Sequence, residues 1–281
     1  MRSSSLALFG SALFVLVATS GCRIEAHTQT QYEDSTQPAK SSVADWAGQP
    51  ISIINDGINP LSGHGGVEVT TSATATKITV SAVFAAYADS DKKADADASI
   101  KDALATLVIE ESANAINVKC GHGSAHGTSN VAGSGCKIIR VTIPAGSATQ
   151  PLDLTVGTGS GDISVGQGGG GTPTVKNLLV DDNGLGDVLV TTSTVPGGTL
   201  SITGERAVKV SLPSDFSAAK VTITVDETDP TKAFARLHTD FTGLISGSPY
   251  PPAGATATAV ASLTVASNGP FEDDTITINK F

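Results

Sequence analysis

The pattern that comes nearest to a chemical site is the glycine-rich run LTVGTGSGDISVGQGGGG at residues 154–171. A phosphate-binding loop requires a lysine after its last glycine, and this run has none. A dinucleotide fingerprint requires a glycine where Asp162 stands, and the nine-residue repeat of calcium-binding β-helices does not recur. We therefore expect the run to turn the chain, with Gly159 and Gly161 at positive φ and Asp162 capping the turn.

A second candidate is the loop CGHGSAHGTSNVAGSGC, which two cysteines bracket. Cys120, His122 and His126 could offer sulfur and nitrogen ligands to zinc or copper. The alternative is a disulfide between Cys120 and Cys136, which would remove the thiolate from that set. The chain has three cysteines, and Cys22 belongs to the leader described below, so the other two form an even pair. We predict the disulfide and no metal site, with metal binding by the histidines as the open alternative.

Carboxylates gather in three stretches, VDDNGLGD, VDETD and FEDD. Paired carboxylates on a β-helix face can hydrolyse glycosidic bonds, but sugar sites also need basic and aromatic side chains, and aromatic residues are 4% of this chain. Turn and surface positions explain these carboxylates better. The chain contains no G-x-S-x-G, H-E-x-x-H or C-x-x-C motif, so we expect no catalytic residue and no cofactor. The residues concerned are Asp181, Asp182, Asp187, Asp226, Glu227, Asp229, Glu272, Asp273 and Asp274.

The first 22 residues resemble the leader of a bacterial lipoprotein. One basic residue precedes the apolar segment LALFGSALFVLVA, and TSGC follows it. The resemblance implies a signal peptide at residues 1–21 and lipidation of Cys22; ordinary signal-peptidase cleavage is the alternative. Arg23 stands where an Asp would resemble the inner-membrane retention signal of Gram-negative bacteria. The resemblance therefore implies an outer-membrane location, with the membrane as a partner through the lipid.

The remaining chain divides into a polar segment and one β-rich domain. Residues 22–50 are polar and aperiodic, which predicts a flexible tether that holds the domain away from the bilayer. From Ile51 onward, short segments of period-two apolarity alternate with glycine and proline turns. One interruption, DSDKKADADASIKDALATL, predicts an inserted helix, because Ile100, Leu104 and Leu107 form one apolar stripe.

The small residues of the central strands favour a particular kind of β architecture. A sandwich core is about 10 Å thick and usually needs large inward side chains. Stacked turns of a β-helix need only Val, Ile and Leu inside and narrow residues at the corners. The expected fold at residues 51–281 is therefore an all-β, mostly parallel β-solenoid, with an antiparallel β-sandwich as the alternative.

Three stretches also resemble a known family. ISIINDGINPLSGHGGVEVT, VTIPAG followed by LDLTVGTGSGDISV, and DTITIN occur in the order typical of exported bacterial adhesins of the DUF4097 type. The resemblance covers residues 51–281 and implies a right-handed, mostly parallel β-solenoid with an adhesin-like surface role. The inserted helix, the cysteine-bracketed loop and the proline-rich C-terminal part depart from the family pattern.

Charge and composition narrow the functional classes. The formal net charge of −10 excludes the basic footprint of a nucleic-acid-binding protein. We expect a lipid-anchored surface protein of the cell envelope that is not an enzyme and that binds an envelope protein or a surface glycan. The alternative is a carbohydrate-active β-helix enzyme.

Overall fold

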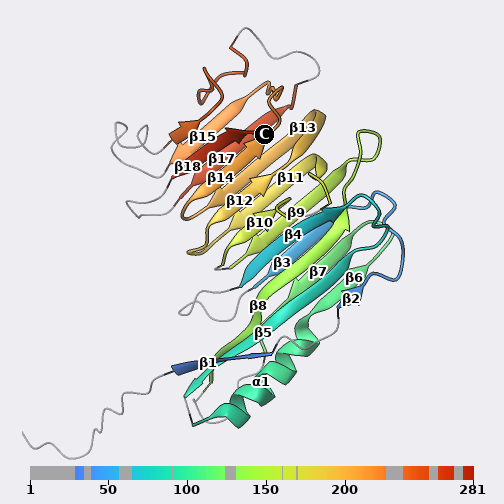
Figure 1. The fold of residues 1–281 in the computed structure, drawn as a ribbon, viewed down its shortest axis with the longest axis vertical. Helices are drawn as coiled ribbons and strands as arrows, with labels where there is room; N and C mark the ends of the chain where they lie inside the picture. Colours follow the sequence, from blue (N-terminus) through green and yellow to red (C-terminus); the bar gives the residue numbers. More distant parts are fainter. Residues whose placement is uncertain are drawn as a thin grey trace, which may run out of the picture.

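The computed structural model describes ten segments of the chain and shows a mostly β protein with one α-helix among the described residues (Figure 1). The all-β prediction is confirmed at this level. The described segments are residues 29–34, 39–56, 65–89, 91–123, 131–159, 161–168, 170–225, 237–252, 259–268 and 275–281.

The strands form two sheets, which we call sheet A and sheet B. Sheet A has the order β1 (Gln29–Asp34), β5 (Thr79–Asp89), β8 (Val131–Pro144), β4 (Gly66–Ser72), β10 (Ile163–Val165), β12 (Val188–Thr191), β14 (Val208–Leu212), β18 (Ile276–Lys280) and β16 (Leu237–Thr239), with β2 (Lys40–Ser41) also on β5. Sheet B has the order β15 (Val221–Val225), β17 (Ser262–Ser267), β13 (Ser193–Gly204), β11 (Thr174–Asp182), β9 (Leu152–Thr158), β3 (Ile51–Asn55), β7 (Ile116–Cys120) and β6 (Val108–Glu111).

The chain alternates between the two sheets over most of its length. From β7 to β18, each sheet-B strand is followed by a sheet-A strand, as in β9 to β10 and β11 to β12, and β3 is likewise followed by β4. We call each such pair of strands a layer. Neighbouring layers pair in parallel in both sheets, while the antiparallel pairs involve β1, β2, β5 and β6 at one end. Both sheets are therefore mixed but mostly parallel.

The spatial order of the layers differs from their order in the sequence. The first layer, β3 with β4, lies between the β7/β8 layer and the β9/β10 layer. The last layer in sequence, β17 with β18, lies between the β13/β14 layer and the β15/β16 layer. Strand patterns in the sequence carry no information about either displacement, because each strand is equally compatible with several parallel neighbours.

The core lies between the sheets and is built from aliphatic side chains in register. Ile53, Val156, Val180, Ile202 and Val265 occupy successive strands of sheet B at matched positions, and all five are fully buried. Because alternate residues of a strand face opposite sides, the period-two pattern in the sequence is the pattern of these inward positions.

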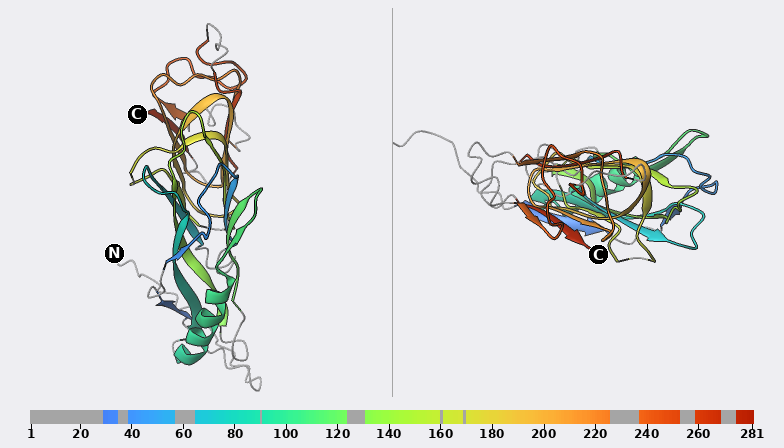
Figure 2. Two further views of the ribbon diagram at one scale, coloured as in Figure 1. Left: turned by 90° about the vertical axis from the view of Figure 1, so that its right-hand side faces the viewer. Right: turned by 90° about the horizontal axis from the view of Figure 1, so that it is seen from above.

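The predicted helix is present as α1 (Lys93–Thr106), at the end of the molecule where the antiparallel strands lie (Figures 1 and 2). Ile100 and Leu107 of the predicted stripe are buried, and Leu104 is partly buried against the core. The helix packs on β5 and β8. It covers apolar residues at this end of the layered body.

The opposite end carries a small aromatic cluster. The ring of Phe241 makes edge-to-face contacts with Phe216 and Tyr250, at centroid distances of 6.0 and 5.6 Å. The main chain at Ala218 exchanges two hydrogen bonds with Tyr250, and the N–H of Val221 donates to the carbonyl of Ser248. The segment that contains Phe241, Ser248 and Tyr250 therefore lies against Ala218 and the start of the edge strand β15.

The structure differs from the predicted tether within residues 29–50. β1 pairs antiparallel with β5 over six residues, and Lys40–Ser41 pairs with the same strand. The Ser42 side chain is buried and accepts the N–H of Ile78, and Trp46 packs against the core and donates from Nε1 to Gln49 O. Polar composition led to the tether prediction, but an edge strand satisfies its backbone in a sheet whatever its side chains are.

Candidate functional site

The predicted cysteine pair joins the two sheets. Cys120 is the last residue of β7 in sheet B, Cys136 lies in β8 of sheet A, and their sulfur atoms are at bonding distance, 1.98 Å. Both residues are fully buried. The bond removes Cys120 from the possible zinc ligands, and His126 lies outside the described residues. Within the described segments, no three His, Cys, Asp or Glu side chains form a group that could hold a metal ion.

Loss of this disulfide should destabilise the domain. The bond closes a loop with a sequence separation of 16, for which the chain-entropy model gives about 3 kcal/mol. We expect the double variant Cys120→Ala/Cys136→Ala to melt several degrees below the wild type. Reductant should lower the melting temperature of the wild type and leave that of the double variant unchanged. Two reactive thiols in the denatured, unreduced wild type would contradict the bond.

The glycine run forms the corner between β9 and β10, as predicted, but for another physical reason. Neither Gly159 nor Gly161 has a positive φ, so that part of the prediction is wrong. A Cβ atom on Gly161 would lie 2.7 Å from the backbone of Gly65, and one on Gly186 would lie 2.3 Å from the backbone of Gly161. Three sheet-B-to-sheet-A corners, from three neighbouring layers, therefore stack backbone against backbone. Glycine is required there because no side chain fits.

Asp162 caps a corner, but the corner belongs to the next layer. Its Oδ1 accepts a hydrogen bond of 3.0 Å from the backbone N–H of Asp187, and its carbonyl accepts the N–H of Val67 at 2.8 Å. Its side chain is exposed. Through its carboxylate and its carbonyl, this residue thus links its own layer to both neighbouring layers, which is a structural role.

Polar side chains line the inside of the same corners. Asn55, Thr158, Asp182 and Ser267 each end a strand of sheet B, and all four are buried. Asn55 donates to the carbonyls of Gly66 and Cys136, Thr158 to that of Gly65, and Ser267 to that of Arg206. These side chains donate hydrogen bonds to backbone carbonyl groups at the corners between the sheets. Buried carbonyl groups need such partners because water does not reach them.

Asp182 is the exception in this polar row. Its Oδ1 accepts the N–H of Gly184 at 3.0 Å, while Oδ2 is buried without a hydrogen-bond partner in the described structure. Burial raises the pKa of this carboxyl from 3.8 to about 7, and the carboxylates of Glu205 and Asp162 act in the same direction. Hydrogen bonds from backbone N–H groups oppose the shift. In the sequence, Asp182 is an aspartate at the end of a predicted strand. Aspartates of surface turns occur at the same kind of position, so the sequence does not mark Asp182 as buried.

The two neighbouring aspartates of VDDNGLGD face opposite ways. Asp182 points into the core, whereas Asp181 is partly exposed and accepts a hydrogen bond from Asn183. Asp187 lies on the outer side of sheet A. A pair of carboxylates flanking one substrate bond is therefore not formed by Asp181 and Asp182. The other two acidic stretches, at 226–229 and 272–274, lie outside the described residues, as does Cys22.

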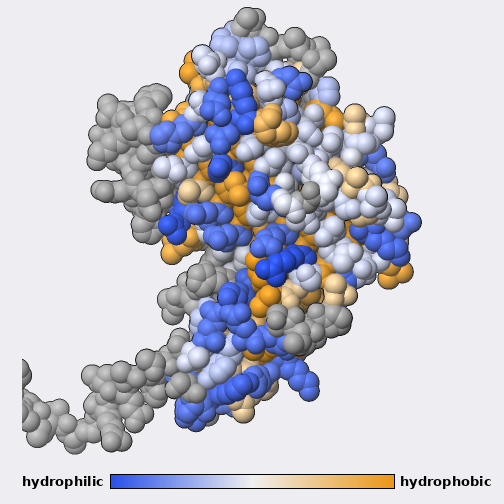
Figure 3. Space-filling view, viewed as in Figure 1, coloured by the Kyte–Doolittle hydropathy of each residue, from blue (hydrophilic) through white to orange (hydrophobic). Residues whose placement is uncertain are grey.

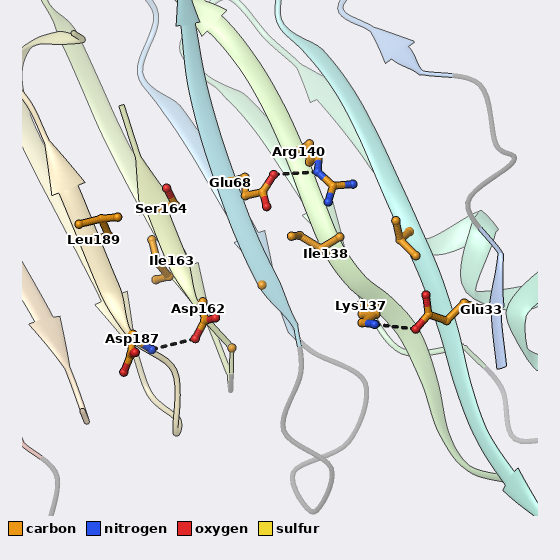
Figure 4. Close-up of a pocket in the computed structure, with 13 residues that line it drawn as sticks. Glu33, Glu68, Lys137, Ile138, Arg140, Asp162, Ile163, Ser164, Asp187 and Leu189 are labelled. Carbon is orange, nitrogen blue, oxygen red and sulfur yellow. Dashed lines mark hydrogen bonds and ion pairs between the residues drawn. The ribbon is translucent and has the colours of Figure 1, made fainter. Parts of the chain in front are cut away.

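The outer face of sheet A carries a shallow groove of about 540 Å³ (Figure 4). Two ion pairs stand over it: Arg140 Nε lies 2.7 Å from Glu68 Oε2, and Lys137 Nζ lies 2.5 Å from Glu33 Oε1. Gly66 lies in the floor, where a Cβ would contact Ile138 at 3.6 Å. The remaining lining residues are Val83, Gly161, Asp162, Ile163, Ser164, Asp187 and Leu189.

Acidic side chains outnumber basic ones in this groove. Its four carboxylates exceed its two basic groups, and its floor is aliphatic, with no aromatic ring among its lining residues. Both basic groups are held in ion pairs, and the carboxylate of Asp162 accepts a backbone N–H. In the face drawn in Figure 3, hydrophobic residues form small patches among polar ones.

Comparison with known proteins adds no relative: no protein-family model matches the chain, and no curated protein matches it. In the described part of the chain, no helix has both the length and the apolar character to cross a bilayer.

Proposed function

We propose that this chain is a lipid-anchored protein of the Gram-negative cell envelope with a non-enzymatic, adhesin-like binding role. The observation that carries the proposal is the groove on sheet A, together with the lipoprotein-like leader ending at Cys22. We further propose that the two sheets form a right-handed β-solenoid of the DUF4097 type. Alternation of strands between two mostly parallel sheets supports this architecture.

The groove is proposed to bind an envelope protein or a surface glycan. Its aliphatic floor offers apolar contact, and its excess of carboxylates offers hydrogen-bond acceptors to hydroxyl or ammonium groups. The placement of Asp181 and Asp182 on opposite sides supports a binding role over glycoside hydrolysis, which needs two carboxyl groups flanking one bond.

A matched pair of variants tests the groove. Leu189 lines it on sheet A, and Leu179 is 45% exposed on the outer face of sheet B. Wild type, Leu189→Arg and Leu179→Arg proteins would be used to capture ligands from the native envelope. We expect Leu189→Arg to lose the captured ligand, because arginine fills and charges the groove, while Leu179→Arg retains it. Equal capture by both variants would place the binding site elsewhere.

The anchoring is tested separately by metabolic labelling with a palmitate analogue. We expect the wild type to be labelled and to fractionate with membranes, because the thiol of Cys22 is the proposed site of lipid attachment. The variant Cys22→Ala should lose both properties. Equal labelling of the two proteins would rule out Cys22 as the lipidated residue.

A further inference from the structure

Strand β1 ties residues 29–34 to the folded domain. β1 begins at Gln29, whose partner is Asp89 at the end of β5, and the pairing continues to Asp34 opposite Phe84. Side chains also hold this strand. The hydroxyl of Tyr87 donates to Gln31 at 2.8 Å, and the ammonium of Lys93 lies 5.8 Å from the ring centre of Tyr32. β1 is thus bound to β5 and to the start of α1.

Six residues, 23–28, separate Cys22 from the first residue of β1. Seven Cα-to-Cα steps span at most about 25 Å, because an extended chain advances no more than about 3.6 Å per residue. A lipid on Cys22 therefore limits how far Gln29 can lie from the bilayer surface. The limit is much shorter than a tether of residues 22–50 would allow.

Position along the sheet then fixes which end is near the membrane. Gln29 pairs with Asp89 at the end of β5, on the first strand of sheet A, whereas Phe241 follows β16, the last strand of that sheet. Figure 1 shows β1 and α1 together at one end of the molecule. Sheet A places nine strands in order from β1 to β16. At about 4.8 Å per strand, the far end of the sheet is roughly 38 Å from β1. That separation exceeds the reach of the six-residue connection.

We infer that the end formed by β1, α1 and the turn between β5 and α1 faces the bilayer and touches the lipid headgroups, while the Phe241 end points away from it. The inference rests on the proposed lipidation of Cys22. The groove, which extends from Glu33 of β1 to Leu189 of β12, then begins at the membrane-proximal edge of sheet A.

The chemistry of this end fits contact with headgroups and not insertion. Residues 91–106 contain three lysines and four aspartates, and two of these lysines form ion pairs, Lys93 with Asp97 at 2.6 Å and Lys92 with Asp91 at 3.2 Å. The surface there is mainly hydrophilic (Figure 3). Residues 91–106 therefore carry no net positive charge that would attract them to anionic lipid. Chain length therefore orients the molecule, and the orientation should be independent of lipid charge.

Fluorescence quenching on the lipidated, full-length protein tests this orientation. Ala94 is exposed in the first turn of α1, and Thr242 is exposed beside Phe241. Since Cys120 and Cys136 are bonded and Cys22 carries the lipid, Ala94→Cys or Thr242→Cys introduces a single reactive thiol. Each labelled protein is placed in phosphatidylcholine vesicles, with and without a nitroxide on the headgroup. We expect quenching at position 94 to exceed that at 242 several-fold, with or without added phosphatidylglycerol.

A linker variant checks that chain length is the cause. Twenty Gly/Ser residues inserted between Glu25 and Ala26 add about 25 Å of root-mean-square reach. Quenching at position 94 should then fall toward the value at 242.

The outcomes separate the inference from the anchoring on which it rests. Equal quenching at both positions, or stronger quenching at 242, in a protein whose lipid is verified by mass spectrometry would overturn the orientation and leave the anchoring intact. Absence of lipid on Cys22 would overturn the anchoring, and with it the inference.

Discussion

Replacing Asp182 with asparagine should raise the melting temperature at pH 8, and by only about a third as much at pH 5. The pKa of Asp182 is raised from 3.8 to about 7 in the folded protein. The folded state therefore holds this proton to higher pH than the unfolded state does, and stability falls as the pH rises from about 4 to 7. At pH 8 the wild type buries a carboxylate whose Oδ2 has no partner in the described structure.

The expected size of the effect follows from the same shift. Each pKa unit corresponds to about 1.4 kcal/mol, so a shift of about three units costs the wild type about 4 kcal/mol above pH 7. Asparagine is neutral at every pH, and its Oδ1 can still accept the N–H of Gly184. At about 2–4 °C per kcal/mol for a domain of this size, the gain at pH 8 is roughly 10 °C.

The neighbouring aspartate supplies the matched control. Asp181→Asn makes the same chemical change at a partly exposed position, so its melting temperature should stay near that of the wild type at both pH values. Thermal melts of the three proteins at pH 5 and pH 8 give the comparison. A lower melting temperature of Asp182→Asn at pH 8 would mean that the carboxylate has a partner that stabilises its charged form.

Replacing Gly186 with valine should cost more stability than an ordinary overpacked core position. The new Cβ would lie 2.3 Å from the backbone carbon and oxygen of Gly161, and backbone atoms cannot rotate away as a side chain can. Overpacking usually costs about 1–3 kcal/mol, and we expect the loss to exceed that range, so that the variant melts more than about 6 °C below the wild type. Gly161→Val should behave alike, because its Cβ would lie 2.7 Å from Gly65.

The control for both glycine variants is Gly170, in the glycine run at residues 154–171 that also contains Gly161. Gly170 has no positive φ, and a Cβ there would meet nothing closer than 3.5 Å. Gly170→Ala should therefore melt within a degree or two of the wild type, since an ordinary surface substitution changes stability by about 0.5 kcal/mol or less. If it destabilises as strongly as Gly186→Val, the stacking of the corners is not the cause.

Calcium gives an independent check on the corner. A structural role for Asp162 predicts equal wild-type melting temperatures in calcium and in chelator, and a small effect of Asp162→Asn, because the amide oxygen still accepts the N–H of Asp187. A calcium-dependent rise of several degrees that vanishes in Asp162→Asn would instead identify a metal site.

Local patterns in the sequence determined most of the secondary structure. Period-two apolarity from Ile51 onward predicted short strands, and the segments ISIIN, LDLTV and AVKVSLP that carry it overlap β3, β9 and β14, because alternation of apolar residues is a property of the strand itself. The stripe that includes Ile100 predicted α1 for the same reason, with a different period. The two cysteines were paired by counting, since an even pair in a chain predicted to be exported has one simple solution.

Contacts between segments that are distant in the sequence decided which positions require glycine, which polar residues form a strand and which carboxylate is buried. The requirement for glycine at Gly161 comes from Gly65 and Gly186, which belong to other layers, so no local rule for turns could supply it. Residues 29–34 look like a polar linker by composition, and only the free edge of β5 makes them a strand. Asp181 and Asp182 are chemically identical, yet Asp181 is partly exposed, whereas Asp182 lies in the core, where burial raises its pKa. Periodicity is encoded within a segment, whereas burial and close approach depend on which segments become neighbours, and that choice is made only when the layers stack.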